Sequence, residues 1–214
     1  MYIETLRSLR QLITRFHTRL IRSSFKRLDS YLDPSIEIKN PEHISIGKAH
    51  IRPHCWIYAI TGDSLDQNRF QPSIEIGDGC SIGRFCHITS SNRVVLEENV
   101  FLTEGVLITD TIHGYENINI PIIKQPLISL GPVVIGRGSW LGNGARIVGR
   151  VTIGKNCIIS TNSVVTKNVP DYCIVAGIPA RIVKRFDETS KKWIVVDEPL
   201  VGSKSIERRD SKDT

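Results

Sequence analysis

Aliphatic residues recur at every sixth position through the second half of the chain, and this spacing is its most regular feature. They stand, in order, at Ile135, Leu141, Ile147, Ile153, Ile159 and Val165. Four positions after each comes a small residue or Val, at Ser139, Ala145, Val151, Cys157, Ser163 and Val169. The same register appears earlier at Ile76, Ile82 and Ile88, and after a two-residue slip it continues at Leu96, Leu102 and Ile108.

A six-residue period matches neither the turn of a helix nor the two-residue alternation of an ordinary strand. It fits a short flat strand followed by a corner, repeated around a triangular solenoid whose coils stack through parallel hydrogen bonds. The aliphatic residue then fills the interior, and the small residue fits the narrow space beside a corner. Cys80, Cys86 and Cys157 occupy this small position, so we expect them to be buried and inert.

The six-residue register stops after Ile108 and resumes near Val133. About 20 residues, 109–132, therefore leave the solenoid, and insertions of this length are commonly functional. This excursion is the strongest candidate for a functional loop.

The two ends of the chain follow other patterns. Residues 1–30 carry seven Lys or Arg against two acids, and steps of three or four residues separate Leu6, Leu9, Ile13, Phe16 and Leu20. This predicts one cationic amphipathic helix over 1–30, whose apolar stripe either packs on the protein or a partner subunit or lies on an anionic membrane. Residues 31–186 form the solenoid domain, and residues 187–214 form a polar C-terminal tail with a loose end.

Composition supports the solenoid and excludes other classes. The 214 residues include 31 Ile and 16 Val against 14 Leu and 5 Ala, a balance that suits strands and argues against an all-α fold. The aliphatic content and a net charge of only +6 exclude a disordered chain. Because the basic excess is confined to one helix, we expect no nucleic-acid partner.

Cysteine usage and apolar runs bear on the compartment. The five cysteines are odd in number and form no CxxC pair, which suggests neither a disulfide framework nor a zinc ribbon and favours a reducing compartment. No secretory apolar core follows the N-terminus, and no stretch of about 20 apolar residues occurs. We expect a cytoplasmic protein, with peripheral attachment to the inner membrane face if the helix binds lipid.

The repeats resemble those of the hexapeptide-repeat acyltransferases over residues 33–184. Residues 109–115 (TDTIHGY), 119–122 (NIPI) and 125–126 (QP) are similar to the excursion loop of the branch that acetylates sugar and polysaccharide hydroxyls, and residues 166–170 and 176–181 also match it. The resemblance implies an all-β fold, a left-handed parallel β-helix, here with an N-terminal amphipathic α-helix and a short C-terminal extension. It also implies a homotrimer whose neighbouring subunits frame each active site, and a cis Ile178–Pro179 bond.

The excursion contains His113, and members of the resembling branch carry a catalytic histidine there. An imidazole with an ordinary pKa of about 6.5 can take a proton from an alcohol near neutral pH and return it to a thiolate. Asp110 or Glu116 could orient the ring, although loop acids are as often simply solvated. Tyr115 is a candidate substrate contact or a packing residue.

The resemblance also implies acetyl-CoA as acyl donor and no metal. The residues that match the donor site are Trp140, Asn143, Ser160, Thr161, Thr166, Lys167 and Arg181. Lys167 and Arg181 would meet phosphates, unless they are ordinary solvated charges. Asn143 and Thr161 replace the Ser or Ala of many relatives. Ser91 and Asn92 form a polar corner where relatives contact the sugar, although a corner needs polar residues in any case.

These features predict an acetyltransferase that moves acetyl from acetyl-CoA to a carbohydrate hydroxyl in surface polysaccharide biosynthesis, with His113 as general base. One alternative is a non-catalytic scaffold built on the same repeats. Another is a zinc hydratase of the γ-carbonic anhydrase type, which needs three histidine ligands. His87 and His113 supply two, but no histidine follows His113 in the sequence.

Overall fold

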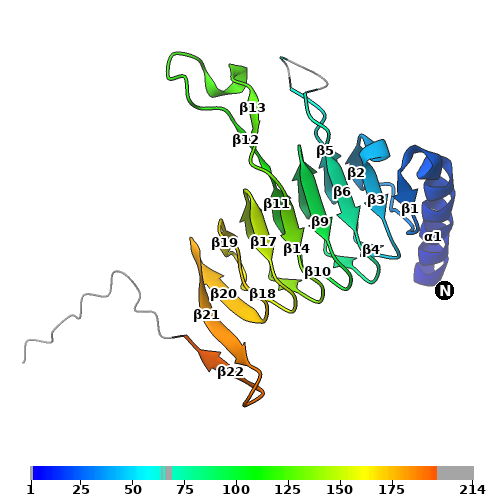
Figure 1. The fold of residues 1–214 in the computed structure, drawn as a ribbon. Helices are drawn as coiled ribbons and strands as arrows, with labels where there is room; N and C mark the ends of the chain where they lie inside the picture. The colour runs from blue at the N-terminus through cyan, green and yellow to red at the C-terminus, as the bar shows by residue number, and fades with distance from the viewer. Residues whose placement is uncertain (1, 64, 66–68, 197–214) are drawn as a thin grey trace, which may run out of the picture.

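The six-residue repeats fold into a left-handed parallel β-helix with three flat faces (Figure 1). The computed structural model describes residues 2–63, 65 and 69–196. Along the chain each coil passes from face 1 to face 2 to face 3, and strands on one face pair in parallel with those of the next coil. The predicted fold class is therefore confirmed.

Each face is a stack of short strands. Face 1 contains β1 (Arg27–Leu28), β3 (Ile44–Ile46), β6 (Ser73–Ile76), β9 (Arg93–Leu96), β14 (Val133–Ile135) and β17 (Val151–Ile153). Face 2 contains β4 (His50–Ile51), β7 (Ser81–Ile82), β10 (Phe101–Leu102), β15 (Trp140–Leu141), β18 (Ile158–Ile159) and β20 (Cys173–Gly177). Face 3 contains β2 (Glu37–Lys39), β5 (Trp56–Ala59), β8 (His87–Ser90), β11 (Leu107–Thr109), β16 (Arg146–Val148) and β19 (Val164–Val165).

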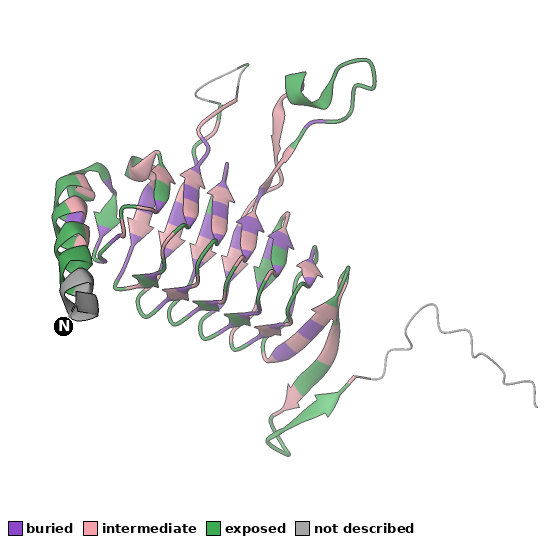
Figure 2. Cartoon of the chain, turned by 180° about the vertical axis from the view of Figure 1, so that it is seen from behind, coloured by how far each residue is buried: buried purple, intermediate pink, exposed green. Residues whose placement is uncertain are grey.

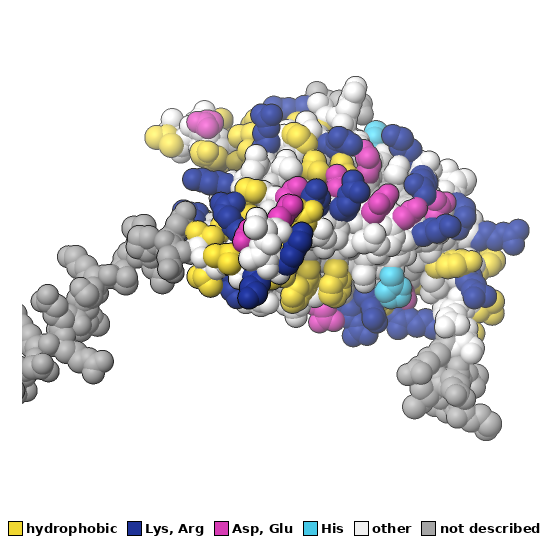
Figure 3. Space-filling model, turned by 60° about the horizontal axis from the view of Figure 1, so that its bottom comes forward, with side chains coloured by type: hydrophobic (Ala, Val, Ile, Leu, Met, Phe, Trp, Pro, Cys, Tyr) yellow, Lys and Arg dark blue, Asp and Glu magenta, His cyan; other side chains and the backbone are white. Residues whose placement is uncertain are grey.

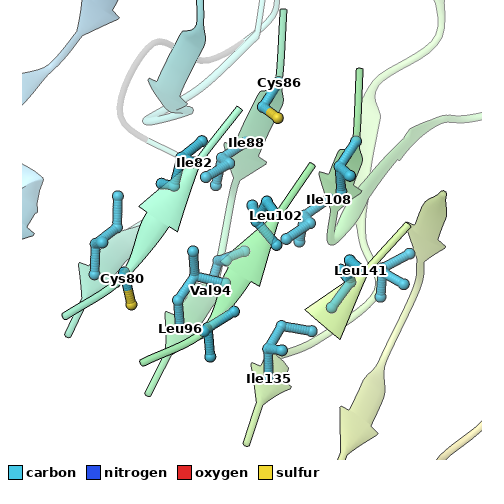
Figure 4. Close-up of a cluster of buried hydrophobic side chains, with 14 of the residues drawn as sticks. Cys80, Ile82, Cys86, Ile88, Val94, Leu96, Leu102, Ile108, Ile135 and Leu141 are labelled. Atoms are coloured by element: carbon cyan, nitrogen blue, oxygen red, sulfur yellow. The ribbon is translucent and has the colours of Figure 1, made fainter. Parts of the chain in front are cut away.

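The interior is a continuous column of mostly aliphatic side chains, because one or two residues of nearly every strand are buried in the core. Figure 2 shows these buried positions recurring along the stacked strands. In Figure 4, Ile82, Leu102 and Leu141 from face 2 stack in successive coils, and all three are fully buried. Cys80, Cys86 and Cys157 are buried as expected, and their thiols donate to backbone carbonyls of adjacent coils at 3.0 Å. Burial raises the pKa of the Cys80 and Cys157 thiols, consistent with inert core residues.

Two excursions leave the β-helix from the edge between faces 3 and 1 (Figure 1). One is the segment between β5 and β6, which we call the 60–72 excursion; its described residues are 60–63, 65 and 69–72. The other contains the antiparallel pair β12 (Thr111–His113) and β13 (Leu127–Ser129), with the 3-10 turn η3 (Ile122–Lys124) between them, and we call it the arm.

The N-terminal helix α1 (Tyr2–Ile21) ends well before residue 30, where the sequence pattern placed its boundary. A 3-10 turn η1 (Arg22–Ser24) follows, and then β1 already belongs to the first coil. The helix stops early because Phe25 and Leu28 pack into the core of the β-helix, which requires the chain to become extended there. A second short turn, η2 (Pro41–His43), lies in the next coil. None of the helices in the described part of the chain has the length and apolarity needed to cross a membrane.

The C-terminal segment is more structured than a polar tail. After the Ile178–Pro179 bond, which is cis, β21 (Ala180–Asp187) pairs antiparallel with β20, and β22 (Lys192–Val195) pairs with β21. This differs from the expected boundary at residue 187, because the strand pairing continues through Phe186 and Trp193, whose rings meet edge to face at 5.5 Å. The expected loose end at 197–214 lies outside the described residues.

Candidate active site

The arm holds His113 on a short antiparallel ladder. His113 lies directly opposite Leu127, and the N–H of Gly114 donates to the carbonyl of Pro126 at 2.8 Å. A Cβ on Gly114 would lie only 2.6 Å from that carbonyl oxygen, so only glycine allows the two strands to approach this closely. The His113 side chain is exposed and therefore open to a substrate.

The tip of the arm is closed by Gln125. Its buried side-chain amide donates to the carbonyls of Asn117 and Ile120, at 2.9 and 2.8 Å, and its carbonyl oxygen accepts from the N–H of Asn117. One side chain thus satisfies three backbone groups of the turn. The arm is consequently a built structure rather than a free loop.

The Asp110 carboxylate, expected to orient His113, is bonded to the corner at the base of the arm. Asp110 is fully buried where the arm leaves the β-helix, and it accepts hydrogen bonds from the hydroxyls of Ser90 and Thr111, both at 2.7 Å. It also accepts from the hydroxyl of Ser91 and from the backbone N–H groups of residues 91–93, at 2.7–3.2 Å. Side chains three residues apart in an extended chain point to opposite sides, so Asp110 faces the corner while His113 faces out.

The three expected sugar contacts are placed differently. Ser91 is buried in the corner, where its hydroxyl donates to Asp110 and accepts from the hydroxyl of Thr111 at 2.8 Å. Asn92 beside it is exposed on the same edge. Tyr115 is exposed two residues after His113 and is free to meet a ligand.

Four of the expected donor-site residues gather around the edge between faces 2 and 3. Trp140 lies on the outer surface of β15, stacked on Phe101 with ring centres 6.4 Å apart. Asn143 follows β15, and its carbonyl accepts from the N–H of Asn162 at 2.8 Å, which places Ser160 and Thr161 in the coil stacked on it. A Cβ at Gly142 would lie 2.7 Å from the nitrogen of Thr161, so the coils are in close contact here.

Of the remaining expected donor-site residues, two lie on another edge and Arg181 lies on the strand beside β20. Thr166 and Lys167 are exposed on the edge between faces 3 and 1, the edge that also carries Asp110 and the arm. Arg181 is exposed on β21, opposite Ala176. A single chain therefore does not bring all seven residues together, and the donor residues around Trp140 lie on a different edge from His113.

Asp63 is a functional candidate that the sequence analysis missed. Its carboxylate accepts a hydrogen bond from the N–H of Leu127 at 2.8 Å and forms an ion pair with Arg69 at 3.4 Å. An acid in a loop resembles any solvated residue. The sequence does signal a second excursion here, because Ile57 and Ile74 are 17 residues apart, which is not a multiple of the six-residue period.

No group of three or more His, Cys, Asp or Glu side chains that could hold a metal ion occurs among residues 2–63, 65 and 69–196. His87, one of the two ligands considered for zinc, lies on the outer surface of β8 with its ring edge-on to Trp56 at 5.4 Å.

Comparison with known proteins agrees with this architecture. Residues 132–167 match the family described as bacterial transferase hexapeptide (six repeats). A putative lipopolysaccharide biosynthesis O-acetyl transferase WbbJ of Escherichia coli K12 is 31% identical over 127 residues, 56% of this chain and 64% of the relative. Across this and three further curated relatives, the chain spans about half to two thirds of their length, from 49% to 64%.

A probable macrolide acetyltransferase of Lysinibacillus sphaericus is 34% identical over 125 residues, which cover 56% of this chain and 68% of that protein. Among solved structures, AntD, an N-acyltransferase from Bacillus cereus, has the same fold, with a TM-score of 0.64, 17% identity and coverage of 81% of this chain and 90% of AntD. The repeats, their three-faced coils and these relatives show that the chain belongs to the bacterial transferase hexapeptide family.

Proposed function

We propose that the protein transfers an acetyl group from acetyl-CoA to a hydroxyl of a carbohydrate, in the biosynthesis of a surface polysaccharide. Two observations on relatives support this. First, the relative WbbJ is a putative O-acetyl transferase of lipopolysaccharide biosynthesis. Second, AntD, which shares the fold, was crystallised with dTDP and 3-hydroxybutyryl-CoA. The proposal rests on the position of His113, which is exposed on an arm held by the β12–β13 pairing and by the bond from Leu127 to Asp63.

His113 would act as the general base. Its imidazole takes the proton of the acceptor hydroxyl while that oxygen attacks the thioester carbonyl carbon, and the carbon–sulfur bond then breaks. The imidazolium returns the proton to the departing thiolate, which yields the acetyl ester and the free thiol. A rigid arm matters because a small displacement of the base from its attacking position costs a large factor in rate.

The donor residues would hold the CoA chain along the edge between faces 2 and 3. Trp140 supplies an exposed aromatic surface, Asn143, Ser160 and Thr161 supply polar groups in stacked coils, and Arg181 supplies a cation. Lys167 and Thr166 lie on the same edge as the arm, so they would meet the donor from a second side.

We propose a homotrimer on this geometry. The base and the Trp140 group lie on different edges of one chain, so a site complete with both forms where the arm of one copy meets the other edge of a neighbour. The tip of the arm also exposes Ile118, Ile120, Ile122 and Ile123, side chains suited to packing on that neighbour. We further propose a cytoplasmic location, supported by five cysteines that are all buried and unpaired.

The direct experiment measures thiol release from acetyl-CoA by the purified protein with a panel of mono- and oligosaccharides. An acceptor-dependent release, with a product acetyl group that mild base removes, supports transfer to a hydroxyl. A base-stable acetyl group would instead indicate transfer to an amine. No release with any sugar would favour the non-catalytic scaffold.

A further inference from the structure

Helix α1 turns its apolar stripe away from the protein. Leu12, Phe16 and Leu20 are 64%, 65% and 64% exposed, and Leu9 and Ile13 are at least half exposed. Nothing in the described part of the chain covers this stripe. An amphipathic helix of a soluble protein ordinarily packs its apolar face inward, so the orientation of α1 is the reverse of the usual one.

Polar contacts fix this orientation. The buried hydroxyl of Thr18 accepts from the N–H of Leu32 at 2.8 Å and donates to the carbonyl of Thr14 at 2.7 Å. About two helical turns before Thr18, two guanidinium nitrogens of Arg10 donate to the Asp33 carboxylate at 2.7 and 2.9 Å. These bonds attach the polar side of α1 to the first coil, which leaves the apolar side in solvent.

Cations lie along one side of the exposed stripe. Arg15 and Arg19 flank it on one side, because residues three and four positions apart share a helix face with Leu12 and Phe16. Arg15, Arg19 and Arg22 form no ion pair within the described residues. Figure 3 shows Lys and Arg side chains beside hydrophobic ones at this end of the molecule.

A cavity of about 550 Å³ beside α1 is lined mainly by positively charged side chains. Arg10 and Arg15 from the helix and Arg52 and Arg84 from two coils line it, with Asp33 as its one acid. Since Arg10 already pairs with Asp33, three guanidinium groups remain for an anionic ligand. Planar guanidinium groups are well suited to phosphate oxygens.

We propose that this end of the molecule docks on an anionic lipid bilayer, with α1 lying in the plane of the interface. The stripe of Leu9, Leu12, Ile13, Phe16 and Leu20 enters the acyl boundary, and the arginines meet headgroup phosphates. A second copy of the chain is the less suitable occupant, because pairing two such helices would bring their arginines together. The proposal does not depend on the chemistry of the arm.

The test is co-sedimentation of the full chain with vesicles of phosphatidylcholine alone and with about one third phosphatidylglycerol. Binding is expected only to the anionic vesicles and should weaken as salt is added. Leu20→Ser and Phe16→Ser should each lower the partition coefficient about tenfold, because each removes one buried apolar side chain. Leu65→Ser is the matched control, since Leu65 is also 64% exposed but lies in the 60–72 excursion.

A double variant, Arg19→Gln with Arg22→Gln, separates charge from apolar burial and should weaken binding to anionic vesicles, whereas Arg137→Gln should not. Equal binding of wild type, Leu20→Ser and Leu65→Ser would overturn the proposal. So would a lowered oligomeric state of Leu20→Ser and Phe16→Ser in light scattering with unchanged vesicle binding, because the stripe would then be a contact between copies. Acetyl transfer to a soluble acceptor should be unchanged in the variants of α1 and of Arg22.

Discussion

Asp63 and Leu127 are 64 positions apart in the sequence, yet the carboxylate of Asp63 accepts a hydrogen bond from the backbone N–H of Leu127 at 2.8 Å. Leu127 is the residue directly opposite His113 in the arm. Neighbouring bonds join Gly114 to Pro126 and Leu130 to Asp110, so the N–H of Leu127 points out of the ladder and is available to another partner. Asp63 therefore braces β13, the strand that pairs with β12 and its candidate base His113.

Asp63→Ala should lower kcat for acetyl transfer by about tenfold or more, with a smaller change in the KM for acetyl-CoA, because the base loses its alignment. Asp63→Asn keeps an oxygen that can accept from Leu127 and should retain most of the activity. Steady-state kinetics of both variants provide the measurement. A fully active alanine variant would show that the arm does not need this brace.

Gly114→Ala should displace the arm, since the added methyl group would lie 2.6 Å from the carbonyl oxygen of Pro126. We expect a loss of kcat with little change in the unfolding midpoint, because the arm lies outside the β-helix core. Gly105→Ala is an instructive control. Nothing lies within 4 Å of a Cβ at Gly105, but its φ of +67° disfavours alanine. Gly105→Ala should therefore lower the free energy of unfolding and leave the arm in place. Normal kcat in Gly114→Ala would count against a fixed arm.

Asp110→Ala should destabilise the protein by about 3 kcal/mol, because it leaves several buried donors of the 90–93 corner without an acceptor. Urea unfolding measures the effect. Glu98→Ala, an exposed acid at another corner, is the comparison and should change stability little. If Asp110→Ala were as stable as wild type but inactive, Asp110 would be a catalytic residue after all.

The sequence revealed the fold because the core of a β-helix depends on local spacing. Ile135 and Leu141 predict their own burial, since every coil repeats the same environment. The break in that spacing also located His113. The direction of the Asp110 carboxylate was not predictable, because it depends on partners 17 to 20 residues away that only coil stacking brings near. Asp63 was hidden for the same reason, and the exposed side of α1 was fixed by Thr18 and Asp33 rather than by the apolar pattern.

The attachment of α1 should weaken in acid. Burial acts to raise the pKa of Asp33, but hydrogen bonds from Ser35 and Arg10 outweigh it and hold the pKa below its ordinary value. A lowered pKa means that the ionised carboxylate stabilises the fold at neutral pH, and this contribution is lost as the pH falls below about 4. Between pH 7 and pH 3, Asp33→Asn should therefore lose less stability than wild type in thermal unfolding. Equal losses of stability in Asp33→Asn and wild type would show that the Asp33 carboxylate does not contribute to this pH dependence.

The most direct test of the proposed function is the acceptor-dependent rate of thiol release from acetyl-CoA by His113→Ala, beside His43→Ala, a partly exposed histidine in η2, as control. We predict that kcat/KM falls by about a hundredfold or more for His113→Ala, because the general base is gone, and stays unchanged for His43→Ala. A His113→Ala variant with wild-type kcat/KM would contradict the account.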